Sequence, residues 1–329
     1  MFGTLDEPTA VRVGPVLAWL RERVGGDDPT VSLLEEFFLR ALPSGWPGGA
    51  HEHHETAWAL GDLFEQAGLA EHAALCRSKV THERLALRHW VARFPGVPAE
   101  FWAPALSALD QPVELPARVG LSMASAQAVL ETVGRGLRLT TAGRLPPKVV
   151  QALDDRFRWS EEFPWMRPPG SPYVGESAIA PLSFLHDHLT AQRLLVRNGR
   201  RLSRSAEGDA CVGDPGRLWR ALVAPAPRWT HDFELDALGV LTAAVLRSDT
   251  FTPGRIAEEM THVLAGKWEP AAHDSVFEGA ALVAQEWYRV GVPLGWWDTG
   301  RGPADRRPND FGRVAAASVF RAVGARPVG

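Results

Sequence analysis

The chain has 329 residues, of which 45% are hydrophobic and 22% charged, with a formal net charge of -4. This length predicts two or three domains with a sizeable buried core, and the composition is typical of globular proteins. Acidic residues stand where a secretion signal would carry basic ones, and the longest apolar run, 237–246, is about half of what spans a bilayer. We therefore expect a cytoplasmic protein that has no part in a membrane.

The two cysteines, Cys76 and Cys211, lie far apart and form no CxxC pair. This spacing argues against a disulfide scaffold and against a cysteine-rich zinc site. Charge is distributed unevenly along the chain: the net charge is -6 over residues 1–110, +5 over 111–228 and -3 over 229–329. Only the middle third is thus a candidate for a polyanionic partner.

The first 112 residues are expected to form a helical domain. Apolar residues recur at the helical period, Thr30 is a capping residue, and Pro43 and Gly68 mark helix ends. The helices expected here span 13–24, 30–42, 51–68, 69–94 and 98–109.

From about residue 116, short strands alternate with helices. The segment "LLVRNGRRLS" at 194–203 predicts a hairpin whose two turn residues are Asn198 and Gly199, both with positive φ. Before it we expect a helix, a strand and two further helices, and after it a closing helix that opens at Asp214-Pro215. This order is that of a winged helix. The ranges expected before the hairpin are 123–133 for the helix, 137–140 for the strand, and 146–157 and 176–192 for the later helices.

The last third of the chain repeats this order. Helices are expected at 233–247, 250–266 and 274–290, followed by a strand with a Gly/Pro-rich wing and a terminal helix at 311–323. The expected fold class is therefore mainly α: a helical domain at 1–112, then two tandem winged-helix-like units with small β-hairpins at 113–228 and 229–329.

The stretches "LRLTTAGRLPPKVVQAL" (137–153) and "GRRLSRSAEGDACVGDPGRLWRALV" (199–223) resemble segments of a broad group of uncharacterised actinobacterial winged-helix-type proteins, some of them plasmid-ORF-like. The resemblance covers about residues 116–225, with a weaker likeness in "RRPNDFGRVAAASVFRAVG". It implies the winged-helix fold and carries over no catalytic residue. The long loop at 158–174 departs from a compact helix-turn-helix.

Five arginines lie in the predicted wing. Guanidinium groups match phosphate oxygens, so this wing is a candidate for contact with a nucleic-acid backbone; the alternative is that the charges only keep a sheet edge solvated. The third helix of each unit is acidic and apolar, which argues against reading of bases in the major groove. The candidate residues are Arg193, Arg197, Arg200, Arg201 and Arg204.

A histidine cluster offers a different chemistry. His51, His54 and Glu55 share one helix face and could bind a divalent metal, with His72 and Cys76 as further ligands from the next helix. The pattern is not the HExxH motif, and the alternative is a polar helix start. Another pair, His186 and His188, is expected at the surface or partly buried.

No motif of nucleophilic catalysis, of phosphate cradling or of dinucleotide binding occurs in the sequence, and we expect no cofactor. The leading hypothesis is a non-catalytic binding or regulatory protein. It would have a protein partner and a non-specific nucleic-acid contact at the wing. The rival hypothesis is a metal-dependent enzyme centred on His51, His54 and Glu55.

Overall fold

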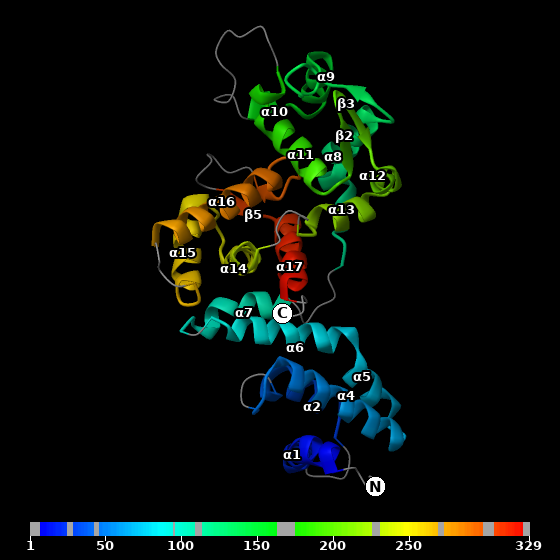
Figure 1. Cartoon of the computed structure of the whole chain (residues 1–329), viewed down its shortest axis with the longest axis vertical. Helices are drawn as coiled ribbons and strands as arrows, with labels where there is room; N and C mark the ends of the chain where they lie inside the picture. Colours follow the sequence, from blue (N-terminus) through cyan, green and yellow to red (C-terminus); the bar gives the residue numbers. More distant parts are fainter. Residues whose placement is uncertain are drawn as a thin grey trace. The chain divides into compact units, whose positions relative to one another are not determined.

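The computed structural model describes residues 7–24, 29–42, 46–94, 96–108, 114–162, 175–225, 231–268, 273–298 and 306–324. The chain divides into two compact units, Met1–Gly96 with Val323–Gly329, and Val97–Ala322. The protein is mainly helical, and the strands within the described ranges are short (Figure 1).

The first unit consists of helices. The expected helix at 69–94 is interrupted at Ser78, which ends one helix and caps the next by accepting a hydrogen bond from the Thr81 backbone N–H at 3.1 Å. A serine oxygen satisfies an otherwise unpaired N–H of the first turn, so it favours a new start at this position. The elements are α1 (Glu7–Val24), α2 (Val31–Glu36), the π-helix η1 (Phe37–Ala41), α4 (Ala50–Gln66), α5 (Ala70–Arg77) and α6 (Lys79–Ala92).

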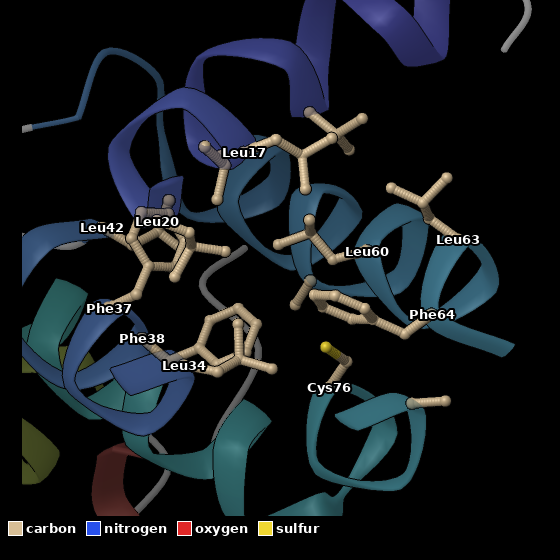
Figure 2. Close-up of a cluster of buried hydrophobic side chains, with 14 of the residues drawn as sticks. Leu17, Leu20, Leu34, Phe37, Phe38, Leu42, Leu60, Leu63, Phe64 and Cys76 are labelled. Carbon is tan, nitrogen blue, oxygen red and sulfur yellow. The ribbon is translucent and has the colours of Figure 1, made fainter. Parts of the chain in front are cut away.

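Aromatic and aliphatic side chains from successive helices fill the core of this unit (Figure 2). Phe37 lies at its centre and is fully buried. Its ring centroid lies 5.3 Å from that of Trp19, 5.6 Å from that of Phe38 and 5.2 Å from that of Trp46. The predicted cap at Thr30 is confirmed, since its hydroxyl accepts from Leu33 N at 3.2 Å.

The second unit begins with α7 (Ala99–Ala108), which packs on α14 (Asp232–Arg247). The division expected from the sequence placed α7 with the N-terminal helices. The predicted boundaries at 112/113 and 228/229 lie outside the described residues, as does most of the predicted loop at 158–174.

The elements that follow α7 come in the expected order, with two short helices, α10 and α12, that were not predicted; α10 lies in the segment expected as a loop. The segment expected as one helix at 176–192 begins as the separate 3-10 helix η3. The elements are α8 (Val119–Val133), β1 (Leu137–Arg138), α9 (Pro147–Phe157), α10 (Trp159–Glu162), η3 (Glu176–Ala178), α11 (Ala180–Ala191), β2 (Leu195–Asn198), β3 (Arg201–Arg204), α12 (Ala206–Cys211) and α13 (Pro215–Val223).

The rest of the second unit comprises α14, α15 (Pro253–Ala265), α16 (His273–Gly291), β4 (Trp297–Asp298), β5 (Arg307–Pro308) and α17 (Asp310–Gly324, of which 323–324 belong to the first unit). The predicted wing between β4 and β5 includes residues 299–305, which lie outside the described residues.

Two small antiparallel sheets have the orders β1-β3-β2 and β4-β5. In the first, the Leu139 N–H donates to the carbonyl of Arg200, the residue just before β3, at 2.7 Å. In the second, the Phe251 N–H donates to the carbonyl of Arg306, the residue just before β5, at 2.8 Å. In each case the carbonyl that precedes the last strand of the sheet accepts a backbone hydrogen bond.

Buried contacts join α8 to the segment that follows α16. The Ser125 hydroxyl on α8 donates to the Pro293 carbonyl at 2.6 Å, and the Ser122 hydroxyl donates to the Leu294 carbonyl. Beside these bonds, the Trp296 ring lies 6.2 Å from Trp219 and 4.8 Å from Trp287, measured between centroids. No helix in the described ranges is long and apolar enough to cross a membrane.

Replacing Phe37 by alanine should destabilise the first unit by about 3–5 kcal/mol, because the truncation leaves a cavity among rings that cannot collapse fully onto it. The expected readout is faster amide hydrogen exchange in α1, α2 and α4. Val80→Ala on α6, where the valine is 46% exposed, is the control and should change exchange little. Equal effects of both substitutions would show that Phe37 does not organise this core.

Candidate nucleic-acid interface

The hairpin predicted around Asn198-Gly199 is present, but its turn lies one residue later than expected. Asn198 pairs with Arg201, so the two turn residues are Gly199 and Arg200. Gly199 has φ +60°, while neither Asn198 nor Arg200 has a positive φ. A glycine at the first turn position is the pattern of a type II′ turn, which also matches the twist of the strands. The expectation of two positive-φ residues was therefore wrong.

The strand register decides which arginines face outward. Leu195 and Leu202 are buried and lie on the inner face of the sheet. Successive side chains alternate between faces, so Arg201 points to the outer face. Arg138 on β1 is its direct cross-strand partner. Two exposed guanidinium groups are thus opposite each other on one face.

Arg135 and Arg200 extend this pair, and we call Arg135, Arg138, Arg200 and Arg201 the arginine face. Arg200 Nη2 donates to the Leu139 carbonyl at 3.1 Å, and Arg201 Nη2 donates to the Arg135 carbonyl at 3.4 Å. All four residues are exposed, and none forms an ion pair with another described residue. Carbonyl contacts hold the side chains of Arg200 and Arg201 in place without neutralising their charge.

Arg204 differs from the other arginines of the predicted wing. Its side chain is only 16% exposed, and its Nε lies 2.7 Å from the Asp209 carboxylate on α12. Its charge is thus balanced within the fold. Arg193 is exposed and adopts φ +58° just after α11, so it precedes the sheet.

Arg197 is exposed but belongs to the inner side of the sheet, opposite Leu202. Its Nε donates to the Gly199 carbonyl at 2.9 Å, and its guanidinium lies over Gly143. The wing arginines named from the sequence therefore have four kinds of surroundings. Arg135 and Arg138 were missed, although the prediction of a strand at 137–140 could have suggested them.

The helix α11, expected from the sequence to be the third helix of a winged-helix order, is largely covered. Between residues 180 and 191 only Asp187 and Thr190 are exposed. His186 and His188, expected at or near the surface, are 7% and 8% exposed. Each buried ring has a hydrogen-bond partner, as buried polar groups generally do. His186 Nδ1 lies 2.7 Å from the Glu176 carboxylate, and His188 Nε2 lies 2.9 Å from the Leu222 carbonyl.

The predicted metal ligands have other contacts. Glu55 pairs with Arg12 at 2.8 Å and with His51 at 3.4 Å, and His51 is 87% exposed. His72 Nε2 lies 2.6 Å from the Pro29 carbonyl, while burial raises the pKa of Cys76 to about 12. Within the described ranges, no three His, Cys, Asp or Glu side chains are grouped in a way that could hold a metal ion.

Histidines instead form two pairs between α4 and α6. His54 Nδ1 lies 2.7 Å from His82 Nδ1, and His53 Nδ1 lies 3.0 Å from His89 Nε2. The exposed Trp58 ring stacks on His82 with centroids 5.1 Å apart. In each pair one nitrogen must donate and the other accept, so both rings cannot be protonated without losing the bond.

The pKa of His54 is lowered to about 4, first by desolvation and then by the neighbouring His82. Desolvation also lowers the pKa values of His82 and His89. Burial disfavours the charged imidazolium, and a nearby histidine adds repulsion once it is charged.

Comparison of the chain with protein-family models, with curated proteins and with solved structures gives no match.

The first unit should lose stability as the pH falls from about 6.5 to about 4. A lowered pKa means that the unfolded chain binds the proton first, so the stability present above pH 6.5 is lost through this window. For the half-buried His54 we expect a loss of about 1–2 kcal/mol after solvent screening. The rate of amide hydrogen exchange in α4 and α6, corrected for its intrinsic pH dependence, measures this loss of stability.

His54→Gln should flatten this pH dependence, whereas His51→Gln should leave it as in the wild type because His51 is almost fully exposed. An unchanged profile in His54→Gln would contradict the assignment of the effect to this pair.

Proposed function

We propose that the protein is a non-catalytic binding protein whose arginine face holds the phosphate backbone of nucleic acid without reading its bases. One observation carries the proposal: Arg138 and Arg201 lie directly opposite each other on an exposed face, and neither has an acidic partner among the described residues. Like charges in direct cross-strand pairs are destabilising by a few tenths of a kcal/mol or more. A bound phosphate removes this repulsion.

The residue type supports phosphate as the ligand. A guanidinium offers a planar fork of donors and is weakly hydrated, so it exchanges water for phosphate oxygens readily. Arg200 and Arg201 each use one Nη2 on a carbonyl, and this restricts their rotamers before a ligand arrives. Ordering these side chains in advance lowers the entropic cost of binding.

We interpret residues 113–228 as a winged-helix-like unit. The order α8, β1, α9, α11, β2, β3 and the sheet order β1-β3-β2 support this interpretation. The hydrogen bond from Phe251 to Arg306, which matches that from Leu139 to Arg200, supports a second such unit at 229–329. The resemblance to actinobacterial winged-helix-type proteins remains part of the proposal.

Contact with the backbone, rather than with bases, is favoured by α11. Its exposed residues are Asp187, whose side chain is 62% exposed, and Thr190. A carboxylate is repelled by phosphate, and a helix covered on most sides cannot enter a major groove about 12 Å wide. Specificity at this surface would therefore be low.

A protein partner stays a prediction, and one observation favours it. A hollow of about 660 Å³ lies in the second unit between α11, α14 and α16. Phe184, Phe233 and Leu282 contribute apolar surface to it, and Leu282 is 68% exposed. Exposed apolar side chains beside a concave surface are a common feature of protein-binding sites.

The triple variant Arg138→Ala/Arg200→Ala/Arg201→Ala tests the nucleic-acid proposal. Wild-type protein should bind random-sequence DNA duplex with an affinity that falls steeply with salt, measured by fluorescence anisotropy. Each phosphate contact contributes about 0.9 to the slope of log K against log salt. The variant should therefore lower that slope by about 2 to 3 and weaken binding to all sequences alike.

The control is Arg156→Ala/Arg220→Ala/Arg255→Ala, which removes the same charge from exposed residues of the same unit. It should keep most of the affinity. Equal losses of affinity in both variants would show that only the net charge of the protein matters. Absence of salt-dependent DNA binding by the wild type would refute the proposal.

A further inference from the structure

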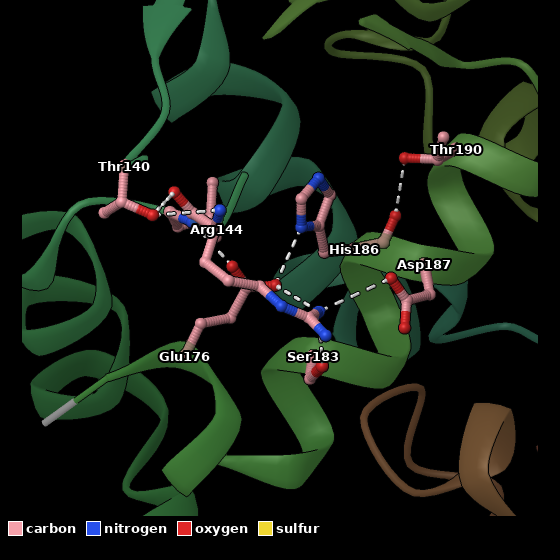
Figure 3. Close-up of polar contacts among 8 residues, drawn as sticks. Thr140, Arg144, Glu176, Ser183, His186, Asp187 and Thr190 are labelled. Atoms are coloured by element: carbon pink, nitrogen blue, oxygen red, sulfur yellow. Dashed lines mark hydrogen bonds and ion pairs between the residues drawn. The ribbon is translucent and has the colours of Figure 1, made fainter. Parts of the chain in front are cut away.

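A second arginine-containing site lies on the inner side of the same sheet, apart from the arginine face. It is a hollow of about 600 Å³ formed by the loop that follows β1, by α11 and by β2. The polar side chains on its wall come from Arg144, His186, Asp187, Thr190 and Arg197. Figure 3 shows the side chains of Arg144, His186 and Asp187 converging from the loop and the helix.

Glu176 fixes the histidine of this hollow. Its carboxylate has no exposed surface and accepts hydrogen bonds from Leu145 N at 2.6 Å and from His186 Nδ1 at 2.7 Å. A buried carboxylate acts as an acceptor, so the hydrogen of the neutral imidazole lies on Nδ1. Nε2 is then left without a hydrogen, and it points away from Glu176 (Figure 3).

Arg144 retains donors for a ligand. Its Nη1 lies 3.2 Å from the Ser183 hydroxyl, and 3.8 Å from both the Glu176 and the Asp187 carboxylates. The two longer distances lie beyond hydrogen-bond range, so these ion pairs leave its N–H groups incompletely used. The side chain is 44% exposed, which allows a ligand to reach it.

Arg197 is positioned by two glycines. Its Nε donates to Gly199, and a Cβ at position 143 would lie 2.5 Å from its Nη1. Gly143 also has φ +75°, so this residue is required both by its backbone conformation and by the close approach of the guanidinium. The two Nη groups of Arg197 have no partner among the described residues.

We propose that this hollow binds the phosphate group of a phosphomonoester. Arg144 and Arg197 supply guanidinium donors for its oxygens, and His186 Nε2 shares a proton with one oxygen. A phosphomonoester has a second ionisation near pH 6, so at neutral pH it is mainly a dianion in equilibrium with a minor protonated form that can donate to Nε2, whereas a phosphodiester has no such proton. This proton distinguishes the ligand from the backbone phosphates of the arginine face.

The charges of the wall fit one phosphate group. Two guanidinium groups face two carboxylates, of which Glu176 is engaged by His186 and the Leu145 N–H, and Asp187 is largely exposed to water. The Arg197 guanidinium has no carboxylate partner among the described residues, so its charge is available to a ligand. The inference uses Arg144 and His186, which are not part of the arginine face, and does not depend on nucleic-acid binding.

Titration of the full chain with methyl phosphate and with inorganic phosphate, followed by calorimetry, tests the proposal. Saturable binding is expected, with a simultaneous shift of the His186 ring signals in the NMR spectrum. Dimethyl phosphate, a diester, should bind at least about tenfold more weakly. Arg144→Gln should also weaken phosphate binding about tenfold or more, as expected from loss of a charge-assisted hydrogen bond. Arg220→Gln on α13, an exposed arginine outside the hollow, is the control.

A comparison of 5′-phosphorylated and unphosphorylated oligonucleotides identifies the source of the phosphate. Tighter binding of the phosphorylated strand in the wild type, lost in Arg144→Gln, indicates a strand end. Binding of the small phosphates alone indicates a small phosphorylated compound. Absence of saturable binding by the monoesters, or equal binding in Arg144→Gln with unmoved His186 signals, overturns the proposal. The triple variant of the arginine face should still bind the small phosphates. Such binding would show that the hollow acts independently of the proposed nucleic-acid contact, so the two proposals can fail separately.

Discussion

The second unit depends on one buried charge. Glu176 is removed from water completely, and a carboxylate in that position is strongly destabilising unless its oxygens are hydrogen-bonded. Its two partners belong to different segments, the backbone before α9 and the side chain of His186 on α11. These bonds fix α11 against the loop that follows β1. The end of α11 then determines where β2 starts, and with it the position of the whole three-stranded sheet.

The run of arginines at 193–204 combines structural and surface roles. Arg204 balances Asp209 and holds β3 to α12, while Arg200 and Arg201 donate only to carbonyl oxygens and keep their charge. The difference follows from strand alternation, which turns neighbouring side chains to opposite faces. A dense basic segment is therefore not one uniform surface, and its residues must be separated by register before any of them is assigned to a ligand.

Local signals predicted most elements of the chain. Thr30 as a cap, the helix start at Pro146-Pro147 and the hairpin near Gly199 all depend on residues close in sequence. The pairing of Arg138 with Arg201 and the bond between Leu145 and Glu176 join residues 63 and 31 positions apart, which no local pattern encodes. The histidine pairs between α4 and α6 were hidden for the same reason. Periodicity placed His54 beside His51 and Glu55 on one helix, but the partner that decides its chemistry lies on another.

The two-residue turn at Gly199-Arg200 limits how far the hairpin can project. The two strands have four residues each and are about 13 Å long. The side chains of their inner face pack on the rest of the unit. Such a hairpin is a short ridge rather than an arm that encloses a ligand. On the proposed function, a phosphate backbone contacts this ridge from one side only and can leave it without any opening of the hairpin.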